Sequence, residues 1–206
     1  MTNACERQQY KNSFNGRLLK RQLDQWFSII DDFKSKNFIG TSNPFYRRLN
    51  IGNFAVALLQ YKDNKNAQQL KYFYSHSYIN TPQRKASFQL FINRAQSNSY
   101  DITSIQDIHN NMVVKVPPLI FSYVKVDVFR SIETPASKDR FNDTESMILE
   151  NILDFVLSNN ITNFYVDLFT YLEPCLCCDK NIISFLKKAP TCGMTLYYEK
   201  PYNKLI

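Results

Sequence analysis

The C-terminal third of the chain alternates between helical and strand patterns, and this alternation limits the folds that it can adopt. Residues 143–160 place apolar side chains at helical spacing, whereas residues 161–172 form a β-branched and aromatic run typical of a strand. Residues 175–188 predict a second helix and residues 194–200 a final strand. Alternating helices and strands predict parallel strand pairing, and therefore an α/β fold built in layers.

The middle of the chain predicts further strands. Residues 54–62 and 70–78 are apolar, β-rich runs separated by a polar segment, the pattern of a hairpin with a longer connection. Residues 88–96 indicate a short helix, residues 101–112 are ambiguous, and the second half of residues 113–130 indicates another strand. Together these segments predict a mixed central sheet of about five strands.

Residues 1–50 are expected to form a helical N-terminal extension to a domain that spans residues 51–206. Residues 16–35 predict an amphipathic helix, because their apolar side chains recur at steps of three and four residues. These side chains are Leu18, Leu19, Leu23, Trp26, Phe27, Ile30 and Phe33. Such a stripe covers one face of the helix, so we expect the helix to pack on the core of the domain.

The composition is that of a globular chain with a basic surface. Of the 206 residues, 44% are hydrophobic, which is enough for a full core. No apolar run is long enough to span a bilayer, and the N-terminus lacks the apolar core of a signal peptide, so no membrane partner is expected. The formal net charge of +7 permits an anionic partner, nucleic acid above all, although a solvated basic surface is the commoner cause of such a charge.

Three of the five cysteines fall within four positions directly after Pro174. An odd, clustered set favours reduced thiols or metal ligands over a disulfide framework. Cys175 and Cys178 lie three residues apart at a predicted helix start, so both sulfurs face one side, and the helix N-terminus favours their thiolate form. Two sulfurs do not complete a zinc site. Asp143, at the start of the preceding helix with Glu145 two residues later, is the candidate third ligand.

A D-x-E sequence at one helix start and P-C-x-x-C at the next, joined by a strand, resemble the zinc-dependent nucleoside and nucleic-acid deaminases, whose signature is H-x-E…P-C-x-x-C. The matching stretches are DTESMILENI and EPCLCCDKNIISFLKK. The bacterial polymorphic-toxin branch is the most similar: its members end in a similar D-T-E helix and PCxxC helix, followed by a strand like TLYYEK. GNFAVALLQY and YFYSHSYIN look like the segments that open such domains. The resemblance covers roughly residues 50–200 and implies a three-layer α/β/α cytidine-deaminase-like sandwich.

The resemblance also implies a site. A catalytic Zn²⁺ is expected on Asp143, Cys175 and Cys178, with Glu145 as the catalytic acid and base. The superfamily has His or Cys where this chain has Asp143, but zinc with one carboxylate and two thiolates carries the same formal charge as zinc with three thiolates. The expected substrate-binding residues are His76, Ser77, Asn80, Phe45, Tyr46 and Pro174. The candidates for stacking on bases are Phe45, Tyr46 and Tyr78. The candidates for contacting phosphates are Lys20, Arg21, Arg47 and Arg48.

Each of these residues has an alternative role. Asp143 is also a good N-cap. Cys175 and Cys178 suit a redox pair, or a structural zinc site completed by Cys192 and Cys5. His76 suits a structural role in the core, and it is also an alternative third zinc ligand.

The function that the resemblance implies is conversion of cytosine to uracil in nucleic acid, with DNA favoured, by the toxin domain of an interbacterial effector. The strand must be single or the base flipped out, because a base inside a duplex cannot reach the zinc. A cognate immunity protein and a monomeric state are expected, with synthesis in a bacterial cytoplasm and delivery as part of a secreted toxin into a target-cell cytoplasm. The alternatives are an adenine- or free-nucleoside-directed deaminase and a non-catalytic zinc-containing binding module.

Overall fold

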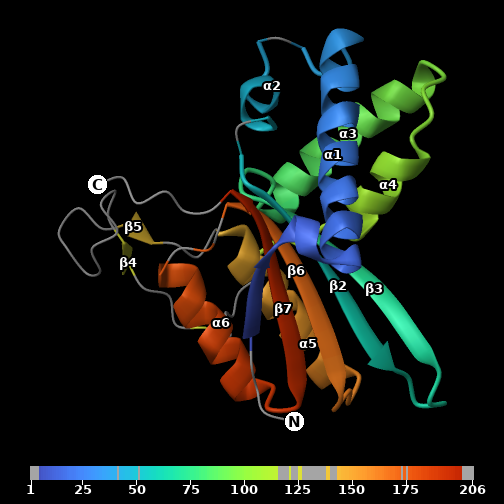
Figure 1. Ribbon diagram of the computed structural model, residues 1–206. Coiled ribbons are helices and arrows are strands. Elements are labelled where there is room, and N and C mark those ends of the chain that lie inside the picture. Colours follow the sequence, from blue (N-terminus) through green and yellow to red (C-terminus); the bar gives the residue numbers. More distant parts are fainter. Residues whose placement is uncertain are drawn as a thin grey trace.

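A five-stranded mixed sheet forms the centre of the computed structural model (Figure 1). Its strands, in the order β1–β7–β6–β2–β3, are β1 (Cys5–Gln9), β7 (Cys192–Lys200), β6 (Phe164–Leu172), β2 (Phe54–Lys62) and β3 (Gln68–His76). β6 and β7 are parallel, as are β7 and β1, whereas β2 is antiparallel to β3 and to β6. The parallel pair and the hairpin predicted from the sequence are therefore confirmed.

The structure describes most of the chain in two long parts. The described residues are 5–40, 42–50, 52–115, 121, 125–126, 138–139, 143–172, 174 and 176–200. The short strands β4 (Lys125–Val126) and β5 (Lys138–Asp139) pair with each other and not with the central sheet. The strand predicted for the second half of residues 113–130 is thus not a central strand in the residues described there, and β1 completes the sheet instead.

Helices cover both faces of the sheet and make three layers (Figure 1). The helices are α1 (Phe14–Ser35), α2 (Pro44–Arg48), α3 (Pro82–Ser97), α4 (Thr103–Asn110), α5 (Thr144–Ser158) and α6 (Leu176–Lys188). Alternate residues of each strand face opposite sides. Phe54, Val56 and Leu58 of β2 join the core formed with α1, α3 and α4. Ala55 and Ala57 join the core formed with α5 and α6.

The N-terminal residues contribute both a strand and a helix to this sandwich. Ser13 caps α1 by accepting a hydrogen bond from the Gly16 amide. Most of the predicted apolar stripe of the helix is buried, while Leu18 and Phe27 are partly exposed. Trp26 stacks on Phe54 of β2 with ring centroids 4.9 Å apart. Among the described residues, no helix is long and apolar enough to cross a bilayer.

Two helices differ from the sequence-based expectation for local reasons. The helix expected at residues 88–96 begins earlier, because the Thr81 side chain caps it and Pro82 occupies its first turn. Within the ambiguous residues 101–112, Thr103–Asn110 form α4, which buries Ile105 and Ile108. The sequence CERQQ of β1 has no apolar alternation, so its strand could be assigned only from its pairing with β7.

Candidate active site

The first turn of α5 carries a buried carboxylate, Glu145, which is 4% exposed. The Thr170 hydroxyl donates a hydrogen bond to Glu145 Oε1 at 2.7 Å, and the Thr144 hydroxyl donates one to Oε2 at 3.1 Å. Asn53 Nδ2 donates to the Thr144 hydroxyl at 2.9 Å and lies 3.5 Å from Glu145 Oε1. A carboxylate is tolerated out of water only when its oxygens are hydrogen-bonded, and these donors also fix its orientation.

Asp143 and Cys178 lie beside this carboxylate. The Cys178 thiol is 3.5 Å from Asp143 Oδ2 and 3.8 Å from Glu145 Oε2. Asp143 occupies the N-cap position of α5, but its side chain makes no capping hydrogen bond. The structure therefore places Asp143 at the predicted helix start while its carboxylate turns toward the start of α6.

The separation of these two donors suits zinc. In a tetrahedral site with bonds of about 2.0 Å to oxygen and about 2.3 Å to sulfur, the two ligand atoms lie about 3.5 Å apart. Asp143 Oδ2 and Cys178 Sγ have this separation. The other predicted ligand, Cys175, lies outside the described residues, and within those residues no group of three His, Cys, Asp or Glu side chains is placed to hold a metal ion.

The alternative structural zinc site made with Cys5 and Cys192 is wrong. Cys192 pairs with Phe164 at the first residue of β6, whereas α6 follows the last residue of that strand. A strand of this length spans about 30 Å, so Cys192 and Cys178 lie near opposite ends of β6. Cys5 pairs with Met194, close to Cys192. Burial raises the pKa of the Cys192 thiol to about 12, which keeps it protonated.

His76 is fully buried and has both ring nitrogens occupied. Its Nε2 donates to the Leu49 carbonyl at 3.1 Å, and its Nδ1 accepts from the Tyr78 amide at 3.0 Å. Burial lowers its pKa to about 4, so the ring is neutral. A Cβ at Gly52 would lie 2.3 Å from His76 Cε1, so this position requires glycine. His76 therefore anchors the surrounding loops, and neither nitrogen is left for a metal.

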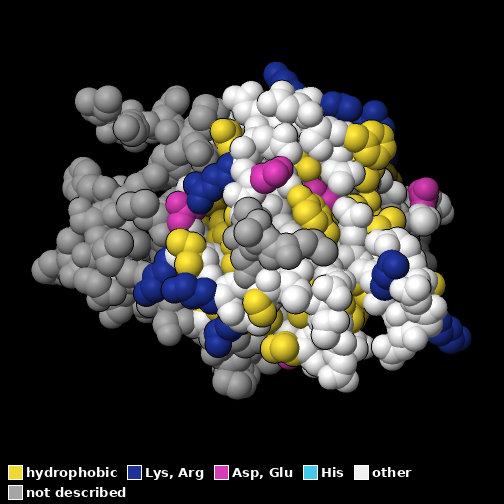
Figure 2. Space-filling view, turned by 60° about the horizontal axis from the view of Figure 1, so that its bottom comes forward, with side chains coloured by type: hydrophobic (Ala, Val, Ile, Leu, Met, Phe, Trp, Pro, Cys, Tyr) yellow, Lys and Arg dark blue, Asp and Glu magenta, His cyan; other side chains and the backbone are white. Residues whose placement is uncertain are grey.

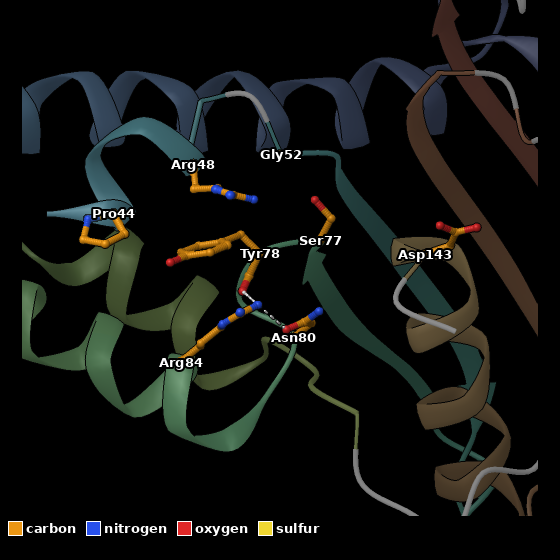
Figure 3. A pocket seen from close by; sticks show the side chains of 8 residues that line it. All are labelled: Pro44, Arg48, Gly52, Ser77, Tyr78, Asn80, Arg84 and Asp143. Atoms are coloured by element: carbon orange, nitrogen blue, oxygen red, sulfur yellow. Dashed lines mark hydrogen bonds between the residues drawn. The ribbon is translucent and has the colours of Figure 1, made fainter. Parts of the chain in front are cut away.

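A cavity of about 580 Å³ opens beside the carboxylate cluster (Figure 3). The residues that line it are Pro44, Arg48, Gly52, Ser77, Tyr78, Asn80, Arg84 and Asp143. Five residues expected to bind substrate or metal thus share one cavity: Arg48, Ser77, Tyr78, Asn80 and Asp143. Asp143 lies on the side of the cavity opposite Arg48 and Arg84 (Figure 3). Because Asp143 also adjoins Cys178, it connects the cluster around Glu145 to the cavity.

Other expected substrate contacts take supporting positions. Phe45 is 8% exposed and packs edge-to-face on Tyr78, with ring centroids 5.0 Å apart, so it supports that ring and offers no free face to a base. Pro174 is buried and does not line the cavity. The side chain of Tyr46 lies outside the described part of the structure.

The basic residues expected to contact phosphates are dispersed. Lys20 forms ion pairs with Asp24 and Glu199, so its positive charge is neutralised within the protein. Arg48 lines the cavity, and Arg21 and Arg47 are exposed outside it. Figure 2 shows Lys and Arg side chains in separate groups over the visible face, and no described histidine reaches this surface.

Sequence reasoning did not find Asn53, Thr170 or Arg84. Thr170 lies on β6 and Asn53 just before β2, and both reach Glu145 only because the sheet brings these strands together. Arg84 reaches the cavity from α3. None belongs to a local motif, although Thr144 falls within the quoted D-T-E stretch. No family model, curated protein or solved structure matches this chain.

Proposed function

We propose that the protein is a zinc-dependent deaminase that converts cytosine to uracil in nucleic acid, with DNA as the favoured substrate. The observation that carries this proposal is the buried Glu145 carboxylate, whose Oε2 lies 3.8 Å from the Cys178 thiol, which in turn lies 3.5 Å from Asp143. A buried carboxylate beside candidate metal ligands, one of which lines a cavity, is the arrangement that hydrolytic deamination requires.

Asp143, Cys175 and Cys178 are the residues that would hold the zinc ion. When bound, zinc supplies the Lewis acidity that makes a water molecule nucleophilic near neutral pH. Cys178 lies in the first turn of α6, and the helix N-terminus there would offset part of the negative charge of the ligands once zinc is bound.

Glu145 moves the protons of the reaction. Deamination of cytosine adds water at C4 and expels ammonia, so one group must carry one proton of the water to ring nitrogen N3 and the other to the leaving amine. Thr170 and Asn53 hold Glu145 Oε1, which leaves Oε2, on the side of Cys178, as the oxygen that accepts and returns the proton. Thr144 steadies Oε2 through its own hydrogen bond.

The proposal includes a biological setting. The likeness of DTESMILENI and EPCLCCDKNIISFLKK to the polymorphic-toxin deaminases supports a role as the toxin domain of an interbacterial effector. Its partners would be a single-stranded or flipped-out strand and a cognate immunity protein, and the protein would act as a monomer in the cytoplasm of a target cell. The net charge of +7 favours a polyanionic substrate.

The test is sequencing of treated nucleic acids. Purified wild-type protein and the Glu145→Gln variant are incubated with single-stranded DNA, double-stranded DNA, RNA and free cytidine. Cytosine-to-uracil changes in DNA with wild type, and their loss in the variant, would support the proposal. Conversion of adenine or of free cytidine alone would replace the substrate assignment, and no conversion of any substrate by zinc-loaded protein would reject the enzyme.

A further inference from the structure

Two guanidinium groups lie close to one aromatic ring on the side of the cavity opposite Asp143 (Figure 3). Arg84 Cζ lies 4.6 Å from the centre of the Tyr78 ring, and Arg48 Cζ lies 5.6 Å from it. Arg48 comes from α2 and Arg84 from α3, while Tyr78 follows the end of β3. Three separate segments therefore converge on one small basic surface.

The part of this basic surface made by Arg84 and Tyr78 is held in place before any ligand arrives. Arg84 Nη1 donates to the Tyr78 carbonyl at 3.1 Å and to Asn80 Oδ1 at 2.9 Å. Phe45 supports the Tyr78 ring from its edge. Asn80 is 5% exposed, so the loop between β3 and α3 is fixed at this point. A preorganised site loses less side-chain entropy on binding.

The two positive charges are not neutralised within the described protein. Neither Arg48 nor Arg84 forms an ion pair with a described carboxylate, in contrast to Lys20. Both side chains are exposed at the cavity, where a guanidinium presents a planar set of donors that matches phosphate oxygens. A cavity of about 580 Å³ is within the size range of sites for nucleotide-sized ligands.

We propose that Arg48 and Arg84, held on Tyr78, bind a backbone phosphate of the substrate strand while its base reaches the side of the cavity where Asp143 lies. This inference rests on the proposed deaminase function and adds a substrate requirement. The protein would act on nucleotides within a DNA strand, and a free nucleoside, which has no phosphate, would bind poorly.

Binding of a short DNA strand tests the site. A fluorescently labelled single-stranded DNA pentamer with a central cytosine is titrated with full-length Glu145→Gln protein, so that the strand stays unaltered. Adding Arg48→Gln or Arg84→Gln should weaken binding about tenfold, the effect of losing one charge-assisted contact. Each should also lower the slope of log affinity against log salt by about 0.7.

Arg94→Gln is the matched control. Arg94 is exposed on the same helix as Arg84, about 15 Å further along, and its replacement removes the same charge. It should leave affinity and salt slope nearly unchanged. A pentamer with uncharged methylphosphonate linkages should bind equally to wild-type and Arg48→Gln backgrounds.

Two outcomes would overturn the phosphate site. One is unchanged DNA binding in Arg48→Gln. The Arg48 side chain makes no hydrogen bond to described residues, so this variant should fold even if Arg84→Gln does not. The other is an equal loss in Arg94→Gln, which would indicate general charge attraction. Arg48-dependent binding without deamination by the wild type would reject the deaminase proposal and retain the site. Deamination by the wild type together with Arg48-independent binding would reject the phosphate site and retain the deaminase proposal.

Discussion

Two buried carboxylates, Glu145 and Asp167, lie on opposite faces of the central sheet and differ in their neighbours. Asp167 of β6 is 1% exposed and accepts hydrogen bonds from Tyr197 at 2.9 Å, Gln60 at 2.7 Å and Asn15 at 2.9 Å. Burial raises the pKa of Asp167, and these bonds partly oppose the shift. Asn15 lies on α1, so Asp167 ties that helix to the sheet.

Glu145 is nearly as buried, but its neighbours include a thiol and a second carboxylate. The Thr170 hydroxyl holds Oε1 and the Thr144 hydroxyl holds Oε2. Oε2 also faces Cys178, which adjoins Asp143 at the cavity. Burial and hydrogen bonding are thus common to both carboxylates. What distinguishes the candidate active site is that a thiol and a second carboxylate, both candidate metal ligands, lie beside Glu145, and that the second carboxylate, Asp143, lines a cavity.

The largest expected difference is in turnover. Glu145→Gln keeps the size of the side chain and an acceptor for Thr170, but it cannot transfer protons, so deamination should fall by at least about 10² to 10⁴. Asp167→Asn should keep turnover per folded molecule within a few-fold. The rates are measured on single-stranded DNA after the folded fractions are matched by circular dichroism. Equal losses in both variants would break the comparison.

Zinc content should also distinguish the surroundings of Glu145 from those of Asp167. Cys178→Ser and Asp143→Asn should each lower zinc affinity by more than the roughly 10- to 100-fold that loss of an outer-shell partner costs. Asn caps about as well as Asp, and Asp143 makes no side-chain cap, so α5 should remain stable. Metal analysis after dialysis, with His76→Gln and Asp167→Asn as controls, measures this. Zinc loss confined to His76→Gln would contradict the assignment of Asp143.

His76 extends the comparison, because like Asp167 it is buried among neutral partners. Its pKa is about 4 in the folded protein and 6.5 in the unfolded chain. Below pH 6.5 the unfolded chain binds the extra proton, so the free energy of unfolding should decrease as pH falls, by about 3 kcal/mol in total by pH 4. Urea unfolding at pH 7 and pH 4 measures this decrease. His76→Gln should show a smaller decrease, and an identical one would refute the role of His76.

The smallest effect is expected from Asp167→Asn on stability. Its amide group would face one of the donors Tyr197, Gln60 and Asn15, leaving a buried pair of donors without an acceptor. The free energy of unfolding should fall by about 1–3 kcal/mol at pH 7, with zinc content unchanged. Urea unfolding at neutral pH provides the value. A variant as stable as the wild type would mean that Asp167 does not hold α1 on the sheet.

Local pattern was sufficient for much of the fold. The periodicity of residues 143–200 predicted α5, β6, α6 and β7 in order, and the hairpin of β2 and β3 was equally clear. β2 was predicted with the bounds that it has, Phe54–Lys62. These patterns depend on neighbouring residues, whose side chains alternate or recur regardless of what lies across the sheet. The same local reading identified Asp143 and Glu145 at one helix start and Cys178 at the next.

Tertiary structure decided what these residues meet. β1 became the edge strand through parallel pairing with β7. Cys192 lies beside the first residue of β6, at the end of the strand away from Cys178. Thr170 reached Glu145 across the sheet-helix interface, and Arg84 reached Tyr78 from α3. Such contacts join residues far apart in the chain, and the spacing of neighbouring residues carries no information about them. The sequence by itself therefore determined the order of elements in residues 143–200 and, through its resemblance to the deaminases, the candidate acid and ligands, whereas long-range packing alone decided their partners and the cavity beside them.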